Sequence, residues 1–157
     1  MTKPGAGAQS NRDASRAVLL ETTQCLCLAS RRAARAITRR FDTALRPHGI
    51  RATQFTLLAA LELKGPQPVG ELADLMGADR TTLTRNLAVA QEQSLVAIRP
   101  GDDARSRIAS ITPRGRQTLT RAFPVWRRTQ SELTDAIGTG TADTLRQISR
   151  GHAVHTT

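Results

Sequence analysis

Tyrosine is absent from this sequence of 157 residues, and phenylalanine and tryptophan together make up only 3% of it. A hydrophobic core therefore has to be built mainly from leucine, isoleucine, valine and alanine. This composition favours helices, because alanine and leucine propagate helices well. The length fits one compact domain.

Cysteine and long apolar segments are also scarce. Cys25 and Cys27 are the only cysteines, and no apolar run is long enough to span a membrane. The first residues, MTKPGAGAQSNRDAS, lack the apolar stretch of a signal peptide. These absences predict a reduced, cytoplasmic protein that does not contact a membrane.

Acidic residues and lysines are few, whereas arginine is abundant. The chain has 13 acidic and 23 basic residues, a net charge of +10, and only two lysines, Lys3 and Lys64. A GC-rich genome explains the preference for arginine over lysine, but it does not by itself explain the excess of bases over acids. Arginine matches phosphate and guanine edges, so the excess indicates nucleic acid as the partner. Solubility and binding to a membrane surface are the alternatives.

Motifs of enzymes and metal sites are missing from the sequence. It contains no phosphate-binding loop, no G-x-S-x-G and no cluster of metal ligands, and the HAVH segment falls in a predicted tail. We therefore expect a protein that is not an enzyme and has neither cofactor nor metal.

Apolar spacing and breakers predict the order of elements. Residues 1–18 form a weakly ordered lead, and a long helix covers about residues 19–45. A second helix follows Thr53, which we take as its N-cap, and the segment KGPQP ends it. We expect one domain over residues 19–150 and a tail over residues 151–157.

Two short helices joined at Gly77 follow. The first covers Val69–Met76, and the second is capped by Asp79 and extends to about Gln93. In these two helices and the turn between them, a small residue, a glycine and an aliphatic residue are spaced as in a helix-turn-helix. Leu83, Leu87 and Ala90 are predicted to face inward.

A β-hairpin and a long helix complete the pattern. LVAIRP and RIASIT alternate with the period of strands and are separated by the polar loop GDDARS. Thr112 caps the next helix, which contains Pro124 and ends at Gly138, and a short helix covers about residues 141–149. The predicted fold is mostly α with a small β-hairpin wing, in other words a winged helix-turn-helix.

The second helix of the pair has an unusual outer face. Short hydroxyls let a helix lie deep in a major groove, and arginine reaches guanine or phosphate. A solvated helix face is the alternative, but such a face usually mixes glutamate with lysine, and no acid lies between Arg80 and Gln91. The candidate DNA-binding residues on this face are Arg80, Thr81, Thr82, Thr84 and Arg85.

The hairpin tip carries a second set of candidates. Asp103 can pair with Arg105 and stiffen the turn, which leaves Arg105 or Arg107 to enter a minor groove. The alternative is a surface salt bridge that contributes about 0–1 kcal/mol.

Three segments resemble the multiple antibiotic resistance regulator (MarR) family of bacterial transcription factors. They are QFTLLAAL, VGELADLMGADRTTLTRNL and DDARSRIASITPRGR. The resemblance covers about residues 25–148. It implies a homodimer formed by the first helix and the last two, which binds a pseudo-palindromic double-stranded DNA operator. We expect this regulator to be a repressor that a small-molecule effector or thiol oxidation releases. The alternative is a basic helical protein-interaction module without operator-specific binding.

The resemblance also implies an effector and permits a redox switch. Members of the family hold small aromatic or phenolic effectors between the dimer helices and the DNA-binding lobe. Candidates to contact such a ligand are Arg35, Phe41 and His48, although His48 also suits a loop or helix cap, and the first helix carries no strong aromatic cluster. Cys25 and Cys27 are redox candidates whose side chains diverge by roughly 200° on a helix, which disfavours a disulfide between them. Their alternative role is that of small buried hydrophobes.

Overall fold

The computed structural model describes residues 19, 22–101 and 106–151. The chain divides into two compact units, Met1–Arg39 and Arg40–Thr157. The predicted lead and most of the predicted tail lie outside the described residues, so their boundaries stay predictions.

The long first helix begins later than its apolar spacing predicts. Helix α2 covers Leu26–Leu45, and a short 3-10 helix, η1, precedes it at Thr22–Gln24. The hydroxyl of Thr22 donates to the carbonyl oxygen of Leu19 at 2.6 Å. Adjacent threonines interrupt the helix here, because their β-branched side chains and hydroxyls compete with helical geometry.

Helix α3 covers Ala52–Lys64 and begins before the predicted cap. The prediction of Thr53 as its N-cap is wrong, because Arg51 occupies that position. The amide of Ala52 donates to the Asp42 carboxylate at 2.8 Å, and the amide of Arg51 donates to Gln54 Oε1 at 3.0 Å. One acceptor from α2 and one from the first turn of α3 itself therefore satisfy these two amides. Before α3, the 3-10 helix η2 covers Arg46–His48 and ends at Gly49, whose φ is 73°.

The predicted helix-turn-helix is confirmed. Helix α4 covers Val69–Met76 and helix α5 covers Arg80–Glu92. Gly77, between them, has φ 58° and ψ 33°, a left-handed conformation that glycine adopts without steric cost.

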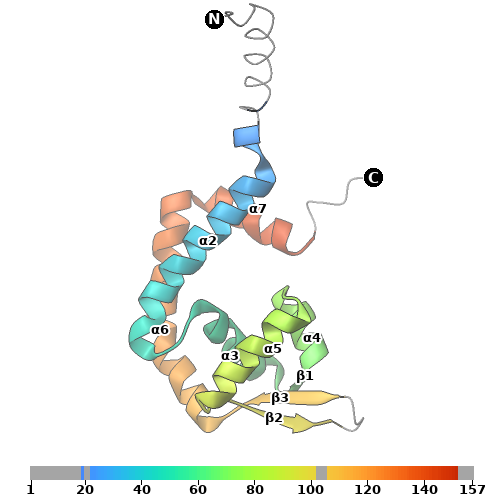
Figure 1. The fold of residues 1–157 in the computed structure, drawn as a ribbon. Coiled ribbons are helices and arrows are strands. Elements are labelled where there is room, and N and C mark those ends of the chain that lie inside the picture. The colour runs from blue at the N-terminus through green and yellow to red at the C-terminus, as the bar shows by residue number, and fades with distance from the viewer. Residues whose placement is uncertain (1–18, 20–21, 102–105, 152–157) are drawn as a thin grey trace, which may run out of the picture. The chain divides into compact units, whose positions relative to one another are not determined.

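The hairpin is also confirmed, but it belongs to a sheet of three strands. Strands β2 (Val96–Pro100) and β3 (Arg107–Ile111) are antiparallel, and β1 (Gln67–Pro68) pairs with the other edge of β3. Strand β1 was not expected, because it lies in the breaker segment KGPQP. Figure 1 shows the hairpin beside α3, α4 and α5, with α6 following β3.

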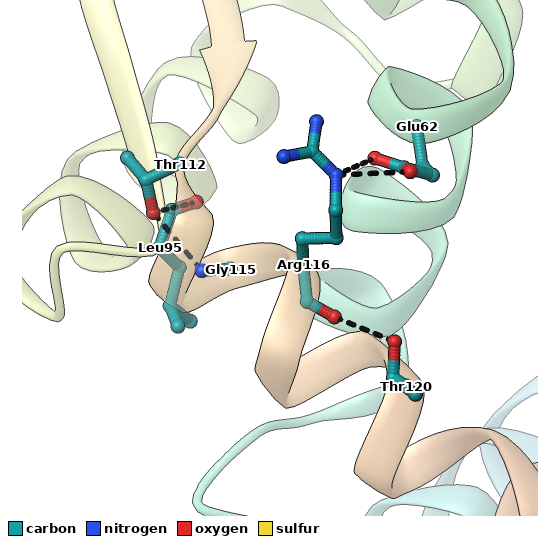
Figure 2. Close-up of polar contacts among 6 residues, drawn as sticks. All are labelled: Glu62, Leu95, Thr112, Gly115, Arg116 and Thr120. Atoms are coloured by element: carbon teal, nitrogen blue, oxygen red, sulfur yellow. Dashed lines mark hydrogen bonds and ion pairs between the residues drawn. The ribbon is translucent and has the colours of Figure 1, made fainter.

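The start of α6 (Pro113–Ile137) is anchored to the base of the hairpin. Thr112 Oγ1 accepts from the amide of Gly115 at 2.9 Å (Figure 2), and its hydroxyl donates to the carbonyl oxygen of Ser94 at 2.7 Å, with that of Leu95 farther away at 3.1 Å. The predicted cap at Thr112 is therefore confirmed. The helix remains continuous through Pro124, and the last helix, α7, covers Thr139–Ser149.

The core of the second unit is aliphatic, as the composition predicts. Leucines from α3, α4 and α5 meet at its centre, together with residues of the sheet and of α6. The largest fully buried side chains are Leu45, Leu57, Leu58, Leu61, Leu72, Leu83 and Leu87. This packing fixes which face of α5 points outward.

Candidate nucleic-acid interface

The N-terminus of α5 is held by a charged cap. The Asp79 carboxylate accepts from the Thr82 amide at 2.8 Å and from the Thr82 hydroxyl at 2.7 Å. The Thr82 hydroxyl is the main cause that lowers the pKa of Asp79, and the backbone amides add to this effect. Asp79 is therefore ionised at neutral pH, and its contribution to stability is lost only as the pH falls through this lowered pKa.

One face of α5 is buried and the opposite face is open. Leu83, Leu87 and Ala90 are buried against the core, as predicted. At about 100° per residue, Thr81 and Arg85 lie nearly opposite this stripe, whereas the other candidates flank it. The predicted outer residues Arg80, Thr81, Thr82, Thr84 and Arg85 are all exposed.

A groove brings part of this face together with the wing. It has a volume of about 450 Å³ and contains Arg80 and Thr84 from α5 and Arg107 from β3. The Arg80 guanidinium lies over Gly70, with Nη2 3.5 Å from the position of a Cβ there. The other residues lining the groove are Pro68, Val69, Gly70, Glu71, Asp74 and Ser106.

The guanidinium groups of the interface are not neutralised within the described part of the chain. Arg80, Arg85 and Arg107 form no ion pair with a described residue, although Glu71 and Asp74 line the groove. Five-donor guanidinium groups on one surface are suited to phosphate and to guanine edges.

The predicted tip of the wing contributes no described side chain. Asp103 and Arg105, both predicted to act there, lie outside the described residues. Their ion pair and their entry into a minor groove therefore stay predictions. Gly101 and Ser106, on either side, are joined by a bond from the Gly101 amide to the Ser106 carbonyl oxygen at 2.8 Å.

Helix α2 carries one aromatic residue, Phe41, but this ring joins an aromatic stack that other helices complete. Phe41 of α2 stacks with Trp126 at a centroid distance of 6.5 Å, and Trp126 also stacks with Phe55 at 5.3 Å and with Phe123 at 5.6 Å. All the aromatic residues of the sequence thus gather in the second unit. No single segment of the sequence indicates this aromatic stack, because its rings come from three helices.

The three predicted ligand contacts are not brought together. Arg35 is exposed and belongs to the first unit, whereas Phe41 lies in the aromatic stack of the second. His48 instead lines a separate cavity of about 550 Å³, in which Phe41 takes no part. Its other lining residues are Gly49, Ile50, Gln93, Leu95, Arg114, Gln117, Thr118 and Arg121.

Both thiols are free and exposed, so they are not buried hydrophobes in this structure. Cys25 precedes α2 and Cys27 lies in its first turn. The expected divergence of roughly 200° between the two side chains requires both residues to be helical, and it therefore does not apply to Cys25. Their redox role stays a prediction.

Metal-binding clusters and membrane-spanning helices are both absent from the described ranges. Residues 19, 22–101 and 106–151 contain no group of three or more His, Cys, Asp or Glu that could hold a metal ion. None of the helices described in these ranges is both long enough and apolar enough to cross a membrane.

Known proteins share both the sequence and the fold. Residues 48–106 match the model of the MarR family. A curated relative, the uncharacterised HTH-type transcriptional regulator YwoH of Bacillus subtilis (strain 168), is 28% identical over 79 residues. That match covers 50% of this chain, and the chain spans only 58% of the length of YwoH.

Solved structures extend the similarity over most of the chain. The M. tuberculosis transcriptional regulator MosR, in complex with DNA, is 38% identical with a TM-score of 0.72, covering 84% of this chain and 99% of MosR. The transcriptional repressor CouR, bound to a 23-mer DNA duplex, is 26% identical with a TM-score of 0.71. The CouR match covers 85% of this chain and 95% of CouR. With its winged helix-turn-helix and these relatives, the chain belongs to the MarR family of transcriptional regulators.

Proposed function

We propose that this protein is a homodimeric, sequence-specific DNA-binding regulator of transcription, a repressor that an effector or thiol oxidation releases from its operator. The observation that carries the proposal is the outer face of α5, where exposed hydroxyls and guanidinium groups lie opposite a buried aliphatic stripe. A DNA-bound relative that is 38% identical over most of the chain supports it.

The roles within the DNA interface follow from position. We assign Arg85, which lies nearly opposite the buried stripe, to a base edge in the major groove. We assign Arg80 and Arg107, which line the groove between α5 and the wing, to phosphates. We assign the wing tip, with Asp103 and Arg105, to a minor groove.

A second copy of the chain is proposed to cover the apolar residues of α6 and α7. Phe123 is 45% exposed, and Leu145 and Ile148 of α7 are 38% and 46% exposed. A symmetric dimer presents two α5 helices, which then read half-sites roughly 34 Å apart on a pseudo-palindromic operator.

The cavity around His48 is the proposed effector site. Arg114 and Arg121, one on each side of Gln117 and Thr118 on α6, line it together with Gln93 at the C-terminus of α5. Among the residues that the structure describes, no acidic one lines the cavity, and its volume of about 550 Å³ is in the range of ligand pockets. A small aromatic or phenolic effector with an anionic group would contact α5 and α6 together. Phe41 stays a proposed contact for a ligand beside the aromatic stack. Arg35, in the first unit, stays a separate proposed ligand contact.

Oxidation is the other proposed release mechanism, because both cysteines are exposed. Replacing Cys25 and Cys27 with serine together should abolish any loss of DNA binding after mild oxidation. If oxidant does not change the binding of the unmodified protein, the thiol switch is excluded and a small-molecule effector is the remaining release mechanism.

Selection from random duplexes, followed by titration of the selected duplex at several salt concentrations, tests the central proposal. A sequence-specific regulator selects a pseudo-palindrome and binds it with a steep salt dependence. A protein-interaction module selects no duplex. A nucleoid-type binder shows the same salt slope without sequence preference, and either of these results would contradict the proposal.

A further inference from the structure

The three threonines of α5 are not equivalent as hydrogen-bond donors. A hydroxyl has one proton to donate, and what it can offer DNA depends on whether that proton is already used. Thr82 donates its proton to the Asp79 carboxylate at 2.7 Å. An ionised carboxylate only accepts, so the direction of this bond is fixed.

Thr84 uses its proton within the helix. Its hydroxyl donates to the carbonyl oxygen of Arg80, one turn earlier, at 2.7 Å. This bond turns the oxygen toward the helix backbone and leaves the methyl group at another staggered position of the same side chain. Thr84 is exposed and lines the groove that also contains Arg80 and Arg107, so its side chain lies on the surface assigned to DNA.

Thr81 differs from both. It is exposed and lies nearly opposite the buried stripe, and its hydroxyl forms no bond to another described residue. Its proton is available to a phosphate oxygen or a base acceptor.

We propose that Thr84 reads thymine through its methyl group, that Thr82 is withheld from donor contacts by Asp79, and that Thr81 is the threonine of α5 that donates to DNA. The inference rests on the proposed DNA-binding function and names the chemistry of its specificity. Thymine is the base whose C5-methyl group projects into the major groove, where a threonine methyl makes an apolar contact with it.

The test uses the full-length protein and the duplex selected as its operator. Each thymine of a half-site is replaced in turn by uracil, which removes the C5-methyl group and keeps every hydrogen-bonding atom. For the unmodified protein, one such replacement should weaken binding about fourfold in each half-site, the loss expected for one buried methyl group.

Substitutions at Thr84 separate the methyl group from the hydroxyl. Thr84→Val keeps a methyl group and should bind within about twofold of the unmodified protein, with the uracil effect retained, because valine and threonine have similar helix propensities. Thr84→Ser keeps the hydroxyl and should bind about fourfold more weakly per half-site and no longer distinguish thymine from uracil. Thr81→Val is the matched control, and it should weaken binding about tenfold to thymine and uracil duplexes alike.

The opposite pattern at Thr84, in which serine is tolerated and valine is not, would show that the hydroxyl reads the base and would overturn the proposal. If no uracil replacement weakens binding, the methyl contact is excluded while operator-specific binding stands. If selection yields no specific duplex, the proposed function itself fails and this inference fails with it. Equal thermal midpoints of all variants confirm that each is folded.

Discussion

Helices α5 and α6 distribute their apolar residues in opposite ways. In α5, the large side chains of Leu83 and Leu87 are buried, and hydroxyls and guanidinium groups are exposed. In α6, the buried residues are small or polar, namely Gly115, Thr118, Ala122 and Thr129. The large apolar residues of α6 remain partly or mostly open, with Trp126 half-buried and Phe123 exposed.

This difference indicates that the two helices are suited to different kinds of partner. A helix that presents donors and positive charge opposite a well-packed stripe is suited to a polyanion. A helix that leaves large apolar side chains open within its own chain is suited to another protein surface. Under the proposed function, the chain uses one face for DNA and another for a second copy. Substitutions on α5 and on α6 or α7 should then affect these two partners separately.

The largest effect is expected from removing all residues after Gly138. This truncation deletes α7, which packs against α6, and with it the exposed apolar side chains of Leu145 and Ile148. The truncated chain should be monomeric or aggregated in analytical ultracentrifugation, whereas the full chain should be a dimer. A well-folded, monomeric full-length protein would contradict the assignment of α6 and α7 to a second copy.

Gly115→Ala should disrupt the packing of α6 against the segment that follows α5. A Cβ at Gly115 would lie 2.1 Å from the carbonyl oxygen of Leu95, so the backbone has to shift. We expect a loss of about 3 kcal/mol in the free energy of unfolding, at the upper end of overpacking effects. Urea denaturation measures it. Gly140→Ala on α7 is the control, because no atom lies within 4 Å of the Cβ it would add, and it should be neutral or slightly stabilising.

Arg85→Ala tests the DNA face of α5 without touching α6. Removing a guanidinium that binds a base edge should weaken operator binding by about 1–3 kcal/mol per half-site and relax the preference at one base pair. Arg105→Ala, at the wing, should be milder and less dependent on sequence. Arg127→Ala on α6 removes the same charge from an exposed position and is the control for fluorescence anisotropy titrations.

If neither Arg80→Ala nor Arg85→Ala changes operator affinity or its salt dependence, α5 is not the recognition helix. Removing one phosphate-binding guanidinium from each of the two subunits should reduce the salt slope by about two. Arg80, which lies over Gly70 in the groove, is the residue of the two that we expect to show this behaviour.

Thr112→Ala should cost about 1 kcal/mol of unfolding free energy, because the Gly115 amide loses its cap at the start of α6. The hydroxyl also bonds the carbonyl oxygens of Ser94 and Leu95, so the substitution should also remove this contact between the start of α6 and the segment that follows α5. Thr120→Ala is the control, since its hydroxyl only bonds the Arg116 carbonyl oxygen within the helix (Figure 2). Equal thermal midpoints for the two variants would show that the cap does not stabilise the contact at the start of α6.

The smallest effect is expected for the ion pair between Glu62 of α3 and Arg116 of α6. Arg116 Nε donates to both carboxylate oxygens, at 3.0 and 2.9 Å (Figure 2). Both side chains are substantially exposed, so a double-mutant cycle with alanine should give a coupling of about 0–1 kcal/mol that shrinks in high salt. A coupling that salt does not reduce would mean that this contact is more than a surface pair.

Local signals in the sequence predicted most of the winged lobe. Asp79 and Thr112 are caps because their side chains bond amides three residues ahead, and Gly77 is a turn because of its left-handed backbone. Each of these features depends on neighbours in the sequence, so it can be read without the fold. The identity of the outer face of α5 follows from the same periodicity.

Features that depend on distant residues could not be read in this way. The cap of α3 comes in part from Asp42, strand β1 exists only because β3 pairs with it, and the aromatic stack joins rings from three helices. The sequence also could not show that Phe41 does not line the cavity around His48, because distant segments pack together to form a cavity.

The sequence by itself thus determined the helices, the turn, the hairpin and the polar face of α5, because periodicity, caps and breakers act within a few residues. Only the tertiary structure decided which arginine shares a groove with the wing, and which hydroxyl protons of α5 are already used. Those properties depend on packing and on hydrogen-bond geometry, which residue type and spacing alone do not specify.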